Sequence, residues 1–168
     1  MHPHNSTLND IARYLSSEDI WLDLRVADKR ELFEAIGRYL EREHGLSPDL
    51  VVTALSRRER AASTGVGEGV AIPHARLNGL ERILVGYARL ASPIAFDAAD
   101  GKPVSHVLVL LVPGPATDEH LKILAGATHL FSDGRFRERL EACAGGDAVV
   151  SLFSTWNEGG RRTAKWTG

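Results

Sequence analysis

One apolar run, VSHVLVLLV at residues 104–112, decides the fold class. Its second part, VLVLLV at residues 107–112, contains no polar side chain. A strand that is apolar on both faces is buried on both faces, so it needs a covering layer on each side. Strand and helix patterns alternate along the rest of the chain, which predicts a layered α/β domain built around this run.

The flanking segments supply the other strands and the helices of this domain. Further strands are predicted at residues 20–26, 70–72 and 83–90. Helices are predicted up to residue 14 or 15, from 29 to about 45, from 48 to about 60, from 118 onward, over 134–144, and from 147 through 153. Turns are predicted at Ser92-Pro93 and at residues 100–103. Some connections between strands are short, so the sheet is predicted to be mixed, with parallel and antiparallel pairs.

Two of these helices begin with recognisable capping signals. Asp28 precedes Glu31 by three positions, which is an Asp variant of the capping box. Ser47 precedes Pro48, which places an N-cap residue directly before a proline in the first turn. Both helices are therefore expected to start at these residues.

The composition of the 168 residues excludes several classes of protein. The formal net charge is −2 and the basic residues are scattered, so no nucleic-acid surface is predicted. A single cysteine leaves no internal disulfide. No apolar stretch approaches the ~20 residues of a membrane span, and the N-terminus lacks the pattern of a signal peptide. We expect a cytoplasmic protein without membrane insertion, with a flexible N-terminus at residues 1–7, one domain at 8–155 and a loose tail at 156–168.

The segment TGVGEGVAIPHA, residues 64–75, contains the first candidate site residue, His74. Pro73 stops the short strand before it, so His74 is expected beyond the carboxyl end of that strand, where open α/β sheets bind ligands. The three glycines of the segment allow close backbone approach and leave amide N–H groups uncovered. An imidazole there is a candidate nucleophile if one nitrogen is deprotonated and the other is held by an acceptor. The local sequence also fits an ordinary loop histidine.

His120 is the second candidate. Thr117 is expected to cap the helix that follows the buried strand, which places His120 at the third helical position, among N–H groups without an intrahelical partner. If strand 104–112 runs parallel to strand 70–72, both histidines lie at one edge of the sheet, beside a helix start that attracts anions. A half-buried histidine at a helix start is the structural alternative.

Arg58 and Glu68 are the other candidate side chains. The guanidinium of Arg58 is suited to bidentate contact with phosphoryl oxygens, and Glu68 is suited to orient an imidazole. The alternatives are an ordinary solvated charge for Arg58 and a turn carboxylate for Glu68. The histidines match no HExxH or HxH pattern, and residues 65–69 match no nucleotide-binding glycine motif, so no metal or nucleotide cofactor is predicted.

Residues 58–75 resemble the enzyme IIA domains of the fructose/mannitol class of the bacterial phosphotransferase system. The family pattern is an acidic or amide residue, six positions, an apolar residue and Gly or Ala, two positions, and then apolar-Ala-apolar-Pro-His and a small residue. Glu59, Val66-Gly67 and VAIPHA at residues 70–75 fill every fixed position. Three later segments, PIAFD at 93–97, LVP at 111–113 and HLKIL at 120–124, extend the resemblance to about residues 8–153.

The resemblance implies a fold and a role for each candidate. The fold is a single three-layer α/β domain with a mixed sheet of about five strands flanked by helices. His74 matches the histidine that accepts a phosphoryl group from an HPr-like carrier protein. His120 matches a second active-site histidine, and Arg58 an arginine that contacts the phosphoryl oxygens. Glu68 lies where related domains often have an acid. The corresponding phosphoryl loop consists of Thr64, Gly65, Gly67 and Gly69.

A domain of this length, with PIAFD at residues 93–97, is most similar to the nitrogen-regulatory type of this class. The resemblance implies a phosphotransferase-system component that transfers phosphoryl groups in signalling, with no cofactor. Its implied partners are an HPr-like donor and regulatory targets such as potassium-transport or sensor-kinase proteins. Three alternatives stay open: a sugar-transport IIA subunit that passes phosphate to a IIB domain, a binding-only module, and a metal-dependent hydrolase.

Overall fold

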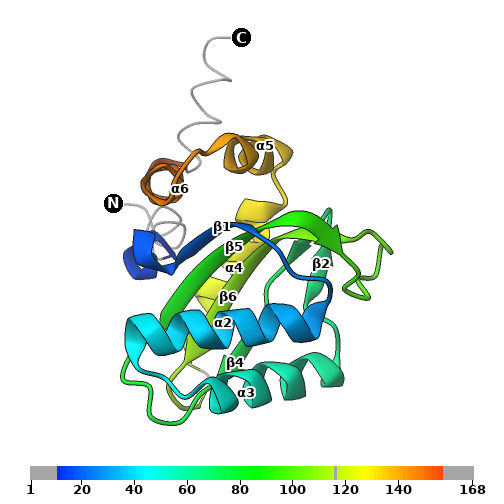
Figure 1. The fold of residues 1–168 in the computed structure, drawn as a ribbon. Coiled ribbons are helices and arrows are strands. Elements are labelled where there is room, and N and C mark those ends of the chain that lie inside the picture. Colours follow the sequence, from blue (N-terminus) through cyan, green and yellow to red (C-terminus); the bar gives the residue numbers. More distant parts are fainter. Residues whose placement is uncertain (1–10, 116, 157–168) are drawn as a thin grey trace.

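The computed structural model describes residues 11–115 and 117–156 (Figure 1). The predicted N-terminal segment 1–7 and the predicted tail beyond Trp156 lie outside these residues. Residues 11–14 are helical, and the short 3-10 helix η1 (Ser17–Asp19) follows. The strands are β1 (Ile20–Leu24), β2 (Gly65–Gly67), β3 (Val70–Ala71), β4 (His74–Arg76), β5 (Leu84–Ile94) and β6 (Val104–Val112). The longer helices are α2 (Lys29–His44), α3 (Pro48–Ala61), α4 (Asp118–Phe131), α5 (Gly134–Ala142) and α6 (Gly146–Thr155).

A single mixed sheet forms the centre of the domain. The strand order is β1-β5-β6-β3-β2, and β4 pairs with β6 off this path. Strands β3 and β4 run parallel to β6, whereas β5 runs antiparallel to it. The predicted mixed sheet is thus confirmed, with six strands rather than about five, because short strands β2 and β4 flank the predicted strand at residues 70–72.

Helices cover both faces of the sheet, which makes three layers (Figure 1). Alternate residues of β6 belong to different hydrophobic clusters because successive side chains of a strand point to opposite faces. Leu108 and Leu110 pack with Phe131, Phe136 and other residues of α4, α5 and α6. On the opposite face, the intervening residues of β6 pack with α2 and α3. The fully apolar run at residues 107–112 is therefore explained by burial on both faces.

The predicted caps are present. Asp28 accepts a hydrogen bond from the N–H of Glu31, and the Glu31 carboxylate accepts one from the N–H of Ala27 at 2.8 Å. Ser47 caps α3 through the N–H of Leu50. None of the helices in the described ranges is both long and apolar enough to cross a membrane.

One predicted turn is wrong. Ser92-Pro93 lies within β5, which continues to Ile94. The β5–β6 register shifts between Arg89 and Ile94, and such an irregularity accommodates a proline, which lacks the N–H that a regular ladder requires. Element ends also move by a few residues from their predicted positions: β1 stops at Leu24, and α5 stops at Ala142.

Candidate functional site

The sheet places His74 through β4. Pro73 lies between β3 and β4, and its carbonyl oxygen accepts the N–H of Leu110 in β6. Both short strands therefore pair with the same strand, β6. His74 then opens β4 opposite Leu110, and its side chain is half-buried. His74 thus lies beyond the carboxyl end of β3, as expected, and it also begins a second short strand of the same sheet, which was not expected.

The two ring nitrogens of His74 have different partners. Nδ1 lies 2.8 Å from the carbonyl oxygen of Ile72, and a carbonyl can only accept a hydrogen bond. Nε2 lies 3.3 Å from Nε of Arg58, which can only donate one. Both contacts require the same neutral tautomer, with the hydrogen on Nδ1 and a lone pair on Nε2 that accepts from Arg58. This is the state that a nucleophilic imidazole needs.

Electrostatics favour the neutral form of His74. Burial lowers its pKa below the usual value for histidine, and the nearby positive charge of Arg58 lowers it further. The hydrogen bond to Ile72 and the negative charge of Glu59 raise the pKa but do not outweigh these effects. The imidazole is therefore unprotonated on Nε2 at neutral pH.

Arg58 lies in the last turn of α3 and reaches His74 from there. Its Nη1 donates to the carbonyl oxygen of Ala62 at 2.7 Å, just past the end of the helix. This second bond directs Nε toward the imidazole. The structure thus brings together two of the predicted site residues, Arg58 and His74.

His120 occupies the predicted third position of α4. Its Nδ1 accepts the N–H of Thr117 at 3.2 Å, while its own N–H donates to the Thr117 hydroxyl at 3.3 Å. Because β6 leads into α4 and runs parallel to β4, the carboxyl ends of both strands lie at the same edge of the sheet. Within the described residues, no hydrogen bond joins His120 to His74.

Glu68 has other partners than His74. It lies at the tip of the β2–β3 hairpin with a φ of 57°, and its carboxylate contacts Lys102 at 3.4 Å and Arg137 at 3.6 Å. Its backbone N–H donates to Asp100 at 2.9 Å. These contacts connect the hairpin tip to neighbouring segments and give Glu68 no hydrogen bond to the imidazole.

The predicted phosphoryl loop folds as this hairpin. Gly67 and Gly69 have positive φ on either side of Glu68, a backbone conformation that favours glycine. The N–H of Gly65 is taken by the Ser63 hydroxyl at 3.0 Å. Thr64 is buried, and its hydroxyl donates to the carboxylate of Glu59. The N–H of Gly65, one of the glycine amides that are expected to be uncovered, therefore has a partner.

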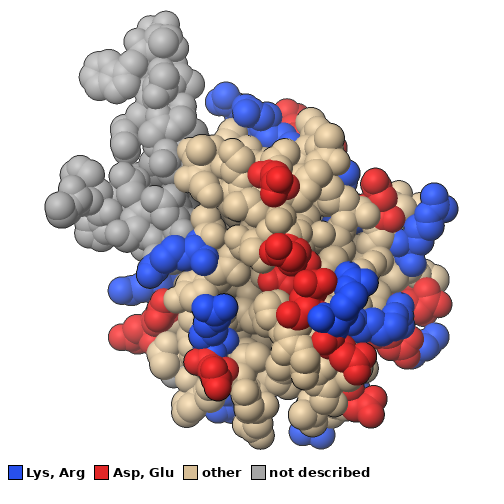
Figure 2. Space-filling model, turned by 60° about the vertical axis from the view of Figure 1, so that its left-hand side comes forward, with Lys and Arg blue, Asp and Glu red and all other residues tan. Residues whose placement is uncertain are grey.

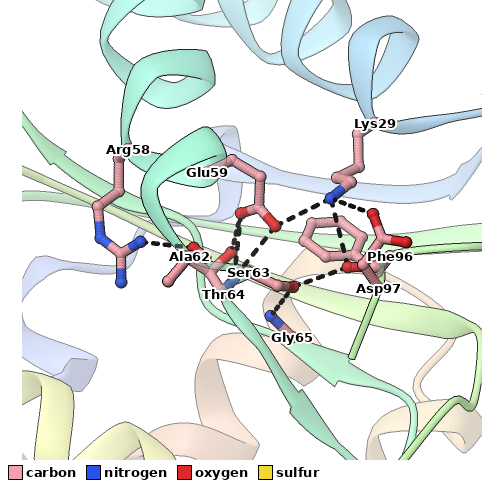
Figure 3. Close-up of polar contacts among 9 residues, drawn as sticks. All are labelled: Lys29, Arg58, Glu59, Ala62, Ser63, Thr64, Gly65, Phe96 and Asp97. Atoms are coloured by element: carbon pink, nitrogen blue, oxygen red, sulfur yellow. Dashed lines mark hydrogen bonds and ion pairs between the residues drawn. The ribbon is translucent and has the colours of Figure 1, made fainter. Parts of the chain in front are cut away.

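Local sequence patterns assign no role to Glu59 or Lys29. Glu59 is a buried carboxylate that contacts Lys29 at 3.1 Å and Thr64 (Figure 3). The sequence feature that marks Glu59 as a possible site residue is its position as the first residue of the family pattern, next to Arg58.

Two further features are the distribution of charge on the surface and the arrangement of side chains that could bind a metal. On the face shown in Figure 2, acidic and basic side chains lie side by side. Among residues 11–115 and 117–156, no group of three His, Cys, Asp or Glu side chains is arranged to hold a metal ion.

Comparison with known proteins places this arrangement in a family context. Residues 13–156 match the family model described as phosphoenolpyruvate-dependent sugar phosphotransferase system, EIIA 2. The nitrogen regulatory protein of Bradyrhizobium diazoefficiens is 35% identical over 144 residues, which are 86% of this chain and 94% of that protein.

Solved structures agree with the sequence matches. The crystal structure of nitrogen regulatory protein IIA-Ntr from Neisseria meningitidis has a TM-score of 0.80 and 42% identity, covering 85% of this chain and 98% of that chain. Enzyme IIAMTL, in its complex with phosphorylated enzyme IIBMTL from Escherichia coli, has a TM-score of 0.68 and 22% identity, covering 84% and 98%. The second likeness shows the fold alone.

Proposed function

The chain belongs to the EIIA 2 family of the phosphoenolpyruvate-dependent sugar phosphotransferase system, with nitrogen regulatory proteins among its relatives, and we propose that it carries a phosphoryl group on Nε2 of His74. The supporting observation is the pair of contacts on the ring. Ile72 holds Nδ1 as the protonated nitrogen, and the lone pair of Nε2 faces Arg58. Nε2 is thus the nitrogen prepared to attack phosphorus.

The proposed donor is the phosphohistidine of an HPr-like carrier. The lone pair of Nε2 forms a new N–P bond while the N–P bond of the donor breaks, and that electron pair returns to the donor's ring nitrogen. Phosphoryl transfer depends mainly on in-line positioning and stabilisation of charge, and side chains of the protein are proposed to supply both here. Nδ1 keeps its hydrogen bond to the Ile72 carbonyl throughout.

Arg58 and His120 are proposed to stabilise the transferred group. The Nε–H of Arg58 occupies the lone pair of Nε2 before reaction and turns to a phosphoryl oxygen when phosphorus arrives. In His120, Nδ1 is an acceptor, so the neutral ring carries its hydrogen on Nε2. That N–H and the N-terminus of α4 are both suited to contact negative oxygens.

The regulatory and transport roles differ in what happens to the phosphoryl group next. A regulatory protein in the cytoplasm would act on targets such as potassium-transport or sensor-kinase proteins, according to its phosphorylation state. The fold shared with enzyme IIAMTL, which was solved with a phosphorylated IIB partner, keeps a sugar-transport role as the second candidate. Transfer from the phosphorylated protein to a sugar-specific IIB domain distinguishes the two.

Intact-mass measurement tests the carrier proposal. The protein is mixed with phosphoenolpyruvate, enzyme I and an HPr-like carrier in the presence of a metal chelator that leaves magnesium for enzyme I. We expect one added phosphoryl group that is acid-labile and base-stable. His74→Gln should remove it, and His129→Gln, at an exposed position of α4, should not. An unlabelled wild type, or labelling that survives His74→Gln, would contradict the proposal.

A further inference from the structure

Glu59 has an unusually complete set of partners for a carboxylate outside the proposed reaction. Only 6% of its side chain is exposed. Both carboxylate oxygens accept the N–H of Thr64 at 3.1 Å, Oε1 accepts the Thr64 hydroxyl at 2.5 Å, and Oε2 lies 3.1 Å from Nζ of Lys29 (Figure 3). A buried carboxylate is tolerated only when it is paired and hydrogen-bonded in this way, so its position is tightly defined.

One path of hydrogen bonds leads from Glu59 to the imidazole. The N–H of Thr64 donates to the carboxylate of Glu59. The carbonyl oxygen of Thr64 accepts the N–H of Ile72 at 3.0 Å. The carbonyl of Ile72 in turn accepts Nδ1–H of His74 at 2.8 Å. The contact that selects the reactive tautomer of His74 therefore depends on a backbone segment that Glu59 anchors.

A second path leads to the guanidinium. Arg58 precedes Glu59 in the last turn of α3, and its Nη1 donates to the carbonyl of Ala62 at 2.7 Å. Ala62 lies two residues before Thr64, in the short segment that Glu59 draws back against the end of the helix (Figure 3). The same carboxylate thus anchors the acceptor that directs Arg58 toward His74.

Lys29 supplies the opposite charge and holds the segment from its other side. Its Nζ contacts Asp97 at 3.0 Å and the carbonyl of Phe96 at 3.3 Å, and it lies 5.0 Å from the centre of the Phe96 ring. The Phe96 carbonyl also accepts the Ser63 hydroxyl at 2.7 Å. Burial lowers the pKa of Lys29, but the hydrogen bonds to Asp97 and Glu59 outweigh this effect and leave the pKa raised, so Lys29 stays charged.

We infer that Glu59, neutralised by Lys29, is a positioning residue for phosphoryl transfer that acts through Thr64 on both His74 and Arg58. This inference rests on the proposed function for its effect on rate. Its effect on the imidazole concerns the unphosphorylated protein and can be measured without any transfer.

Glu59→Gln tests the inference because it keeps the size of the side chain and removes its charge. An amide can still accept from Thr64, but its NH₂ group then faces the ammonium of Lys29. We expect transfer from the HPr-like carrier to slow by about tenfold or more, since small misplacements of reacting groups cost large factors in rate. Glu34→Gln is the matched control, because Glu34 lies on the surface of α2 and pairs only with Arg30 among the described residues.

The ¹⁵N chemical shifts of the His74 ring provide the second readout. In the wild type they should report hydrogen on Nδ1 alone, and in Glu59→Gln a second population with hydrogen on Nε2 should appear. Lost stability alone would not change the tautomer of a molecule that is still folded. If Glu59→Gln does not fold, Thr64→Val removes the shortest of the hydrogen bonds and takes its place.

The two proposals fail in different ways. A wild type that accepts no phosphoryl group refutes the carrier function, and the ring shifts then decide the positioning role alone. The positioning role is overturned if the folded Glu59→Gln variant accepts the phosphoryl group at the wild-type rate. It is also overturned if the variant is slower but the ¹⁵N shifts of its His74 ring are unchanged. The carrier function is unaffected by either result.

Discussion

Thr117 and His120 exchange two hydrogen bonds across the first turn of α4, with the imidazole in the place that Glu or Gln takes in a usual capping box. One ring nitrogen of His120 therefore serves the helix, and the other is the one proposed to contact the phosphoryl oxygens. The two roles are separable by mutation.

His120→Glu should separate them. Glutamate keeps an oxygen for the N–H of Thr117, as in the usual capping box, so the free energy of unfolding should change by less than about 0.5 kcal/mol. Phosphoryl transfer should slow by about tenfold or more, because a carboxylate has no N–H to donate and repels the phosphoryl oxygens. His120→Ala should slow transfer similarly and also lose about 0.5–1 kcal/mol of stability. Urea unfolding and single-turnover transfer measure both effects, and an unimpaired His120→Glu would assign His120 to the helix alone.

Arg58→Lys should slow transfer although it preserves the charge. Lysine has a single nitrogen in place of the two guanidinium nitrogens whose fixed spacing serves Ala62 and Nε2 of His74, so it does not reproduce both contacts. The free energy of unfolding should change by less than about 1 kcal/mol, since partly exposed charges contribute little to stability. Arg57→Lys, at the exposed neighbouring position, is the control and should transfer normally. Unfolding of Arg58→Lys would instead identify Arg58 as a structural residue.

The lowered pKa of His74 predicts a specific pH dependence. Burial and the charge of Arg58 oppose protonation, so the pKa of His74, at which half of the rings are protonated, lies below the usual histidine value of about 6.5. Acceptance of the phosphoryl group should therefore decline only at lower pH. An NMR titration of the ring measures the pKa directly, with His74→Gln to assign the signals. Arg58→Met should raise this pKa, and a wild-type pKa at or above the usual value would contradict the prediction.

Gly86→Ala tests the packing behind β5. An added Cβ would lie 2.7 Å from Cη2 of Trp21, whose ring stacks on Tyr39 with centroids 5.1 Å apart. Such overpacking should cost about 1–3 kcal/mol in the free energy of unfolding. Gly134→Ala is the control, because its Cβ would meet only the end of the flexible Arg137 side chain. Equal thermal stability of the two variants would show that the sheet accommodates the methyl group.

Local patterns predicted most of the secondary structure because the causes were local. The caps at Asp28 and Ser47 involve residues three positions apart, and the burial of residues 107–112 follows from their composition. The turn predicted at Ser92-Pro93 is wrong because these residues fit into β5 through a register shift against β6, which no local pattern reveals.

The sequence alone determined the family, the layered α/β class and the candidate for the reactive histidine. The histidine could be found because the Pro-His pair and the short apolar strand before it are adjacent in the sequence. Tertiary structure decided the chemistry of that histidine. Ile72 is two residues away from His74, but Arg58 comes from the preceding helix, and Glu59 acts through contacts that form only when α3, β2 and β3 pack together. Tautomer and pKa depend on burial and on those distant partners, so they exist only in the folded chain.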